Sequence, residues 1–510
     1  MHALHHALLA ATVKPVSPSP SPPTAFTPLV DLLPEAMLLL GALACLVLAA
    51  LRRRAGIRTY QVISGLALVA AAGCNFAYLR GLPTSSVNPG YVAYANGLVV
   101  DRFTLFLTAT LCAFALFTVL MGTVLSERIR THLGEYHAFL LLATLAGVLL
   151  VSTREMVSAW VAIELLGISL VLLTGTVKTA RRGGEAALKQ FVAGIVSSAV
   201  LLYGLALLYG LGGSTDLVVV AHGATHAGPA LELAMALTLL GLLGKVGVVP
   251  FQRLLPDVFQ GAPAPVIGFA GTVAVTAVLG LFMRVAVTAF PAVQGSWPAL
   301  VALVAALTML YGSLLALRQQ SVRRLLGHLL LAQVGVLLMG FLGWRHENGG
   351  IAVVMVGLAS GGFAVLAAAA VITLVEASGS SDRVDSYRGL SRRSPGAAAA
   401  LSVALLSLAG VPPAIGFFSR LLAMESAVLA GYAWLLVLAL ASTVVGALAA
   451  LRLVRVMFTA EPDADALPLE APFAGRLTLA VCGVAVVALA AAVQPLLSLA
   501  GGGASAVVIR

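Results

Sequence analysis

The chain has 510 residues, of which 60% are apolar and only 10% are charged, and its formal net charge is +10. Soluble domains carry about 25% charged residues, so this composition excludes a soluble enzyme and indicates a polytopic protein in a lipid bilayer. The positive charge does not indicate a nucleic-acid partner, because the basic residues fall in short connections between apolar segments.

A membrane-spanning helix needs about 20 consecutive, mostly apolar residues. The sequence predicts an all-α protein with about fourteen such helices, in one integral membrane domain over residues 29–500. A His-containing, proline-rich stretch at 1–28 is expected to form a disordered tail without a metal site, and 501–510 a second tail. The expected spans are 29–51, 60–80, 102–127, 134–153, 155–178, 187–212, 230–253, 263–290, 297–318, 322–344, 350–377, 395–430, 431–458 and 474–500.

Basic residues gather in alternate connections between these spans. Cytoplasmic loops of membrane proteins carry an excess of lysine and arginine, which fixes the orientation of the chain. The pattern predicts a multi-pass membrane protein with both termini outside the cytoplasm. The basic connections include Arg52, Arg53, Arg54, Arg128, Arg130, Arg181, Arg182, Arg323, Arg324, Arg392 and Arg393.

Lys245 is one of only four lysines in the chain, and it lies inside an apolar run over residues 230–253. A charged side chain near the bilayer centre costs about 2.5–3.5 kcal/mol, so an intramembrane lysine indicates a functional site. A lysine that extends from a helix end to the interface is the alternative. Gly244, Gly247 and Pro250 favour a broken helix beside a polar cavity, as at transporter ion sites.

Two interruptions rich in glycine and proline occur at matching places, residues 244–265 in the seventh predicted span and 407–420 in the twelfth. Each combines a helix break with a basic residue close to it, Lys245 in the first and Arg420 in the second. Proline removes a backbone hydrogen bond, which lipid tolerates only beside a cavity or other protein. The spacing of five spans predicts two inverted five-helix repeats, at about 134–290 and 297–458. Two ordinary proline kinks are the alternative.

Glu164 lies in the middle of a predicted span, with no charged neighbour within one helical turn. It needs a basic partner on another helix, and Lys189 or Lys245 is the candidate. A carboxylate and a lysine held together away from water can bind and release a proton. Lys189 lies nearer the cytoplasmic end of its span, where extension to the interface is the alternative, and Glu232 and Glu425 are expected near span ends.

No cofactor or metal site is expected in this chain. The cysteines are scattered singly through apolar segments without a Cys-x-x-Cys pair, so neither an iron–sulfur cluster nor a zinc site is indicated. No glycine-rich fingerprint follows a strand pattern, so nucleotide and flavin binding are not predicted. The four cysteines are Cys45, Cys74, Cys112 and Cys482.

Several motifs resemble the N-subunit family of bacterial NADH–quinone oxidoreductase, the respiratory complex I. The strongest match is Val249-Pro250-Phe251 followed by the run 256–266, which reads PDVFQGAPAPV. The QGAPAP form favours this subunit over its antiporter-like sister subunits. Supporting matches are Leu32–Glu35 (LLPE), Ser407–Pro412 (SLAGVP), Gly416–Phe418 (GFF) and Arg452–Phe458 (RLVRVMF).

The resemblance implies a fourteen-helix fold with a hydrophilic axis along the membrane midplane. It implies proton translocation driven by NADH oxidation and quinone reduction in other subunits. NADH, flavin, iron–sulfur clusters and quinone are therefore expected in partner subunits, and other membrane subunits as direct partners. In the family pattern, Glu164 matches the fifth-helix glutamate, Lys189 the sixth-helix lysine and Lys245 the seventh-helix lysine.

Three positions depart from that pattern. Val275 occupies the place of the eighth-helix lysine, Arg420 that of the twelfth-helix lysine, and Gln333 that of a tenth-helix histidine. Valine carries no proton and arginine is effectively never deprotonated, so the expected proton path of Glu164, Lys189, Lys245 and Arg420 loses one relay group and gains a fixed charge.

These departures leave three functions open. The first is a proton-translocating subunit of a complex I-type enzyme, and the second is a subunit of a multi-chain cation/proton antiporter. The third is a structural membrane subunit that keeps the fold while pumping is degraded. Hydroxyls at Thr272 and Thr276, with water, could bridge the position of Val275, although Val275 points to a different side of its helix.

Overall fold

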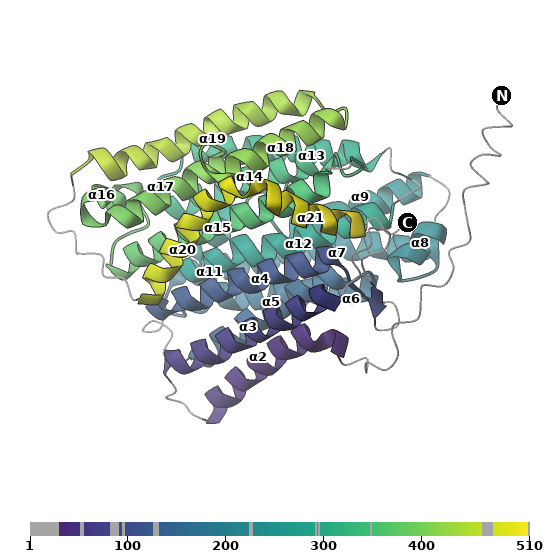
Figure 1. Cartoon of the computed structure of the whole chain (residues 1–510), viewed down its shortest axis with the longest axis horizontal. Helices are drawn as coiled ribbons and strands as arrows, with labels where there is room; N and C mark the ends of the chain where they lie inside the picture. The colour runs from purple at the N-terminus through teal and green to yellow at the C-terminus, as the bar shows by residue number, and fades with distance from the viewer. Residues whose placement is uncertain are drawn as a thin grey trace.

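The computed structural model describes residues 30–51, 56–81, 91–93, 97–125, 132–223, 228–290, 293, 296–346, 349–461 and 473–507. The expected tail at 1–28 lies outside these residues. The described chain is almost entirely helical, and its helices lie side by side (Figure 1). Long runs of apolar residues produce this result, because a helix satisfies all of its own backbone hydrogen bonds without water.

The first half of the chain forms the lower part of the bundle in Figure 1, coloured purple to teal. A two-stranded antiparallel sheet pairs Tyr91 with Val100 at one end of it. The elements are η1 (Val30–Leu32), α2 (Leu33–Leu51), α3 (Ile57–Gly81), β1 (Tyr91–Ala93), β2 (Leu98–Val100), α4 (Arg102–Met121), η2 (Gly122–Leu125), α5 (Leu133–Ser152), α6 (Met156–Thr174), α7 (Arg181–Gly212), α8 (Leu217–Gly223), α9 (Pro229–Gly244), α10 (Leu254–Gly261), α11 (Ala264–Phe269), η4 (Ala270–Ala274) and α12 (Val275–Thr288).

The second half forms the upper part of the bundle, and α20 and α21 cross its face. Its elements are α13 (Trp297–Ala316), α14 (Val322–Phe341), α15 (Gly350–Ala377), η6 (Val384–Tyr387), α16 (Leu390–Arg393), α17 (Pro395–Ala409), α18 (Ile415–Leu429), α19 (Trp434–Thr459), α20 (Phe473–Ala491) and α21 (Val493–Val507).

Within the described residues, twelve helices are long and apolar enough to cross a membrane. The seventh and twelfth expected spans are not among them, because each is divided into two shorter helices, α9 with α10 and α17 with α18. The polytopic all-α fold is confirmed, and the count of fourteen spans stays a prediction. The expected tail at 501–510 needs correction, because helix α21 continues to Val507. The glycine-rich end of α21 is ordered because it packs closely on Phe103 of α4 and Met355 of α15.

The two helix breaks share one backbone geometry. Gly247 and Gly410 adopt positive φ angles of 74° and 81°, in the left-handed region that glycine enters without steric cost. Each glycine stands three residues before a proline with a cis peptide bond, Pro250 in one break and Pro413 in the other. The sequences GVVP and GVPP therefore form the same turn twice, which an ordinary proline kink does not require.

The two broken helices run in opposite directions. Helices α7 and α14 begin at the same end of the bundle, and α10 and α15 end there; we call this end the basic end. At this end Arg323 donates a hydrogen bond to the Ala262 carbonyl at 3.0 Å. The chain that leads into α17 is tied to the same end, because Val384 N–H donates to the carbonyl of Gln320. The α9–α10 pair therefore runs toward the basic end and α17–α18 runs away from it, as inverted repeats require.

The core of the bundle is the segment from α11 through η4 to α12, which is fully buried, together with α14 and α15. The outer helices α2, α3, α7 and α19 expose many large apolar side chains, among them Leu40, Leu66, Leu188 and Val437. Such a surface is stable only against lipid or other membrane proteins.

A π-helical turn, η4, interrupts the central segment immediately before Val275. Turns of this kind in otherwise regular helices occur frequently at functional sites. Thr272 and Val273 in this turn are buried in the core. The turn also determines the direction in which the side chains of the following residues point.

Candidate functional site

Lys245 stands at the C-terminus of α9, where the helix stops at Gly244. A side chain at Gly244 would collide with the ring of Phe251, so glycine at this position allows Phe251 to pack against the end of the helix. The Lys245 side chain is 8% exposed. Its ammonium donates hydrogen bonds to Glu164 Oε1 at 2.9 Å, to the Gly194 carbonyl at 3.2 Å and to the Ser198 hydroxyl.

Three helices build this cluster: α6 supplies Glu164, α7 supplies Gly194 and Ser198, and the end of α9 supplies Lys245. The Ser198 hydroxyl lies within hydrogen-bonding distance of both Glu164 Oε1 and the Gly194 carbonyl, 2.8 Å from the latter. It can therefore accept from the lysine while it donates to either acceptor. All three protons of the ammonium have an acceptor, which is the condition for holding a charge away from water.

A small cavity adjoins the cluster between α6 and α7. Glu164 and Lys245 line it together with Gln190 and Gly194, and Ala274 and Val278 of the central segment close its inner side. The Glu164 side chain is 28% exposed, so Glu164 is the more accessible member of the pair. Water in this cavity could receive a proton from the pair or supply one.

Sequence reasoning left two candidate partners for Glu164, and the structure assigns Lys245. Lys189 lies elsewhere: its side chain is 52% exposed and its ammonium is 2.8 Å from Glu185 and 3.9 Å from Asp257. Asp257 also lies 3.3 Å from Arg324, so Lys189 belongs to a partly solvated ion network at the basic end.

Arg420 is buried on α18, with 2% of its surface exposed. Its guanidinium donates to Gln333 Oε1 at 3.1 Å, to Thr443 Oγ1 at 3.0 Å and to the Leu408 carbonyl at 2.9 Å. Among the described residues it forms no ion pair. The positive charge is held by neutral dipoles alone, and its position against the second helix break matches the expected fixed charge.

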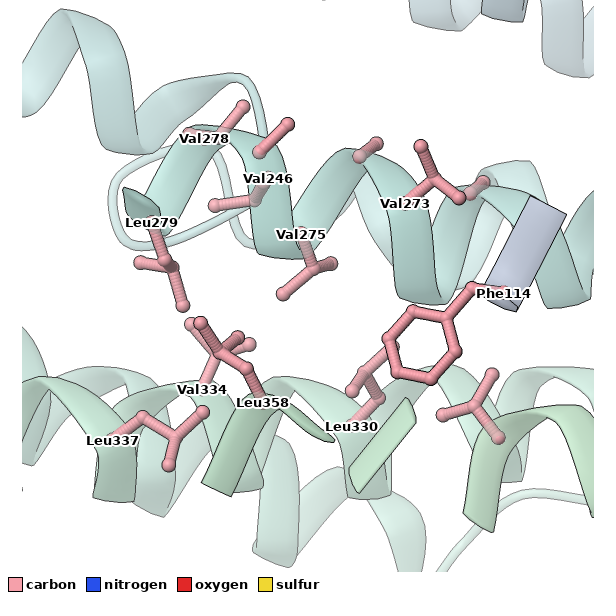
Figure 2. Close-up of a cluster of buried hydrophobic side chains, with 14 of the residues drawn as sticks. Phe114, Val246, Val273, Val275, Val278, Leu279, Leu330, Val334, Leu337 and Leu358 are labelled. Carbon is pink, nitrogen blue, oxygen red and sulfur yellow. The ribbon is translucent and has the colours of Figure 1, made fainter. Parts of the chain in front are cut away.

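A cluster of buried apolar side chains surrounds Val275 (Figure 2). Val275 is 3% exposed and points from the central segment toward the helices that carry Val334 and Leu358. Val246, which follows Lys245 in the chain, lies on one side of this cluster. Val334, which follows Gln333, lies on the other side. Its other labelled members are Phe114, Val273, Val278, Leu279, Leu330 and Leu337.

The threonines near this cluster do not offer an obvious bypass. Thr272 is 1% exposed, and its hydroxyl donates to the Gly268 carbonyl at 2.7 Å within its own helix. Thr276 is also 1% exposed. The side chains around Val275 are apolar and closely packed, so a proton would meet a barrier there.

Sequence reasoning missed two buried groups. His328 on α14 is 1% exposed, and neither ring nitrogen has a hydrogen-bond partner; its isolation in an apolar span was the available signal. The second is the pair of Arg284 and Asp101, which are 1% and 2% exposed and 3.1 Å apart. Nothing in the sequence joins these two, because they are 183 positions apart.

The described residues contain no group of three His, Cys, Asp or Glu side chains that could hold a metal ion. The chemistry of the site is therefore that of a buried lysine and glutamate bridged by a hydroxyl. Such a pair can move a proton without a cofactor, since the amine and the carboxylate each exist in two protonation states.

A broken-helix site of this kind, in a bundle with two matching breaks, defines an antiporter-like membrane subunit. The profile of the family described as NADH:quinone oxidoreductase/Mrp antiporter, transmembrane, matches residues 153–446, and the chain belongs to this family.

The relatives narrow the comparison. NADH-quinone oxidoreductase subunit N 2 of Acidobacterium capsulatum is 37% identical over 404 residues, which cover 75% of this chain and 81% of that protein. NADH-quinone oxidoreductase subunit N of Thioalkalivibrio sulfidiphilus is 32% identical over 380 residues, covering 73% and 78%. The expected resemblance to the N subunit is thereby confirmed.

Solved structures agree. A chain of respiratory complex I from Thermus thermophilus, with bound aureothin, superimposes with a TM-score of 0.76 at 30% identity, covering 92% of this chain and 99% of that one. A chain of the Mrp complex from Dietzia shares the fold, with a TM-score of 0.81 at 20% identity and coverage of 94% and 98%.

Proposed function

We propose that this chain is a membrane subunit of a complex I-type NADH–quinone oxidoreductase and takes part in proton translocation coupled to quinone reduction in other subunits. The observation that carries the proposal is the hydrogen-bonded cluster of Lys245, Glu164 and Ser198 at the first helix break. The similarity to N subunits supports the choice of parent complex.

The mechanism follows from the contacts of the lysine. With Glu164 ionised, Lys245 holds its proton because all of its donors are bonded. If the charge on Glu164 is removed or its side chain turns toward the open edge of the cavity, the ammonium loses its counter-charge while it remains buried. Desolvation then favours the neutral amine, so the proton leaves. Ser198 lies beside both groups and can pass a proton between them.

A second candidate function rests on the other half of the bundle. The apolar cluster around Val275 and the fixed charge of Arg420 favour a subunit that keeps the fold while proton transfer along the membrane midplane is interrupted. Under this alternative, the Lys245 cluster responds electrostatically to neighbouring subunits but no proton crosses the middle of the chain.

The surroundings of the chain follow from the same proposal. The exposed apolar faces of the outer helices contact lipid and other membrane subunits of the complex in the bacterial cell membrane, with both termini outside the cytoplasm. The chain carries no redox centre of its own. NADH, flavin, iron–sulfur clusters and quinone bind in partner subunits.

Replacement of Lys245 in the assembled complex tests the proposal. Lys245→Ala is expected to reduce proton pumping and the coupled quinone reduction strongly in inverted membrane vesicles, with assembly intact. Lys245→Arg is expected to impair both as well, because a guanidinium does not release its proton. Lys189→Ala is the matched control, since its partly solvated ion pairs lie outside the cluster. Full activity of the arginine variant would reduce Lys245 to a fixed charge.

A further inference from the structure

A second polar cavity lies at the end of the bundle opposite the basic end, among the first four long helices. Asp31 and Glu35 line it from η1 and α2, and Asn75 of α3 lines it from a second side. Thr104 and Thr108 of α4 and Ser152 of α5 complete its polar surface. This cavity is separate from the Lys245 site, because α5 packs between α2, which carries Glu35, and α6, which carries Glu164.

Glu35 is the unexplained group in this cavity. Its Oε2 atom is buried and has no hydrogen-bond partner among the residues that the structure describes. An ionised carboxylate removed from water without a cation or donor is among the most costly groups in a protein interior. No residue that lines the cavity is basic. Among the described residues the chain offers this oxygen neither a donor nor a cation, so its partner must be water in the cavity, a bound proton or an ion from outside the chain.

The neighbouring acid shows the contrast. Asp31 Oδ1 accepts a hydrogen bond from the Tyr91 hydroxyl at 2.8 Å. Burial, together with this bond to Asp31, raises the pKa of Tyr91, so the phenol remains a donor. Asp31 thus has a permanent partner from the chain. Glu35, one helical turn further along, has none at its inner oxygen.

The arginine that contacts the wall of the cavity, Arg284, is already paired. Arg284 donates to both oxygens of Asp101, at 3.1 Å and 3.3 Å, and to the Thr104 hydroxyl at 2.9 Å. It also donates to the carbonyl of Val151 at 3.0 Å. Thr104 therefore forms the wall between the cavity and a neutralised ion pair. Polar groups line the cavity, so water can enter it, but no fixed charge compensates Glu35.

We propose that Glu35 is a second proton-binding carboxyl group, which exchanges protons with the outer aqueous phase through this cavity. Each exchange breaks one O–H bond of the acid and transfers the proton to a water molecule in the cavity, and the return reaction restores it. No other bond changes. With the predicted orientation of the chain, the start of α2 faces the outside of the cell, so the site serves the side opposite the ion network of Lys189 and Asp257.

Carbodiimide labelling of the assembled complex in native membranes tests the proposal. Dicyclohexylcarbodiimide takes the proton of an un-ionised carboxyl group in an apolar site, and the carboxylate oxygen adds to its central carbon to give an O-acylisourea. The acyl group then migrates from that oxygen to a nitrogen of the same adduct, which gives a stable N-acylurea. Mass spectrometry is expected to find this adduct on the peptide that contains Glu35. Glu164, which is paired with Lys245, is expected to react far less. Glu35→Gln must abolish the adduct on its own peptide.

Two further measurements make the outcome decisive. Glu35→Gln keeps the side-chain volume, so the thermal stability of the complex should not change while the number of protons released outside per electron falls. Loss of Lys245 function should leave the labelling of Glu35 unchanged, which separates this proposal from the proposed function. No adduct on Glu35, protection of Glu35 by Na⁺ at constant pH, or a full proton yield in Glu35→Gln would each overturn it.

Discussion

The contact between Lys245 and Glu164 makes a quantitative prediction. Their charged atoms are 2.9 Å apart, and the side chains are 8% and 28% exposed. Hydrogen bonds between charged groups contribute about 1.5–3 kcal/mol net, and residues in one network couple by about 0.5–3 kcal/mol. We therefore expect a coupling energy of about 1–3 kcal/mol between Glu164→Gln and Lys245→Ala, which corresponds to about 5–150-fold in rate.

The assay is the initial rate of proton-coupled quinone reduction in inverted vesicles, measured for the parent complex, the two single variants and the double variant. Once Lys245 is gone, the charge of Glu164 has no partner to hold, so the double variant should be no slower than the slower single variant. Ser198→Ala should have a smaller effect, about fivefold for the loss of roughly 1 kcal/mol. If the two single defects simply multiply in the double variant, the residues act independently and the proposed pairing is wrong.

The other expectations concern the middle of the chain, the basic end and the fold. Val275→Lys should raise the number of protons moved per electron, because it restores a titratable group inside the apolar cluster; an unchanged yield, beside robust pumping by the unmodified subunit, would show that the lysine is dispensable and exclude a scaffold role. Lys189→Ala should change the pumping rate by less than about fivefold, since exposed ion pairs contribute about 0–1 kcal/mol; a loss as large as that of Lys245→Ala would place it in the proton path. Asp101→Asn should destabilise the subunit by about 3–5 kcal/mol, because it leaves Arg284 buried without its counter-charge, and unchanged thermal unfolding in detergent would contradict this.

The difference between the two halves of the chain has a physical basis. Lys245 meets a carboxyl group, a hydroxyl and a cavity, so its proton has a place to go. Arg420 meets only an amide, a hydroxyl and a carbonyl, and its guanidinium keeps its proton. Both sit beside a helix break of the same backbone form, with Gly247 in one and Gly410 in the other. One scaffold therefore holds a titratable site in one half and a permanent charge in the other.

The sequence by itself determined the membrane class, the helical fold and the two breaks. An apolar run of about 20 residues is stable in lipid only as a helix, and glycine and proline interrupt the helix at positions that the sequence shows directly. It also marked Lys245 and Glu164 as candidate site residues, because a charge in an apolar span indicates a functional site wherever its partner lies. The positions of Val275 and Arg420 were likewise readable as departures from the family pattern.

Only the tertiary structure decided which groups meet. Glu164 and Lys245 are 81 positions apart and Asp101 and Arg284 are 183 apart, and no local pattern encodes such contacts. The same holds for missing contacts. The lack of a hydrogen-bond partner at Oε2 of Glu35, among the described residues, can be recognised only from the positions of the side chains around it. The local sequence determines which charged side chains each helix contains. The packing of the helices determines which of these side chains form ion pairs or hydrogen bonds and which do not.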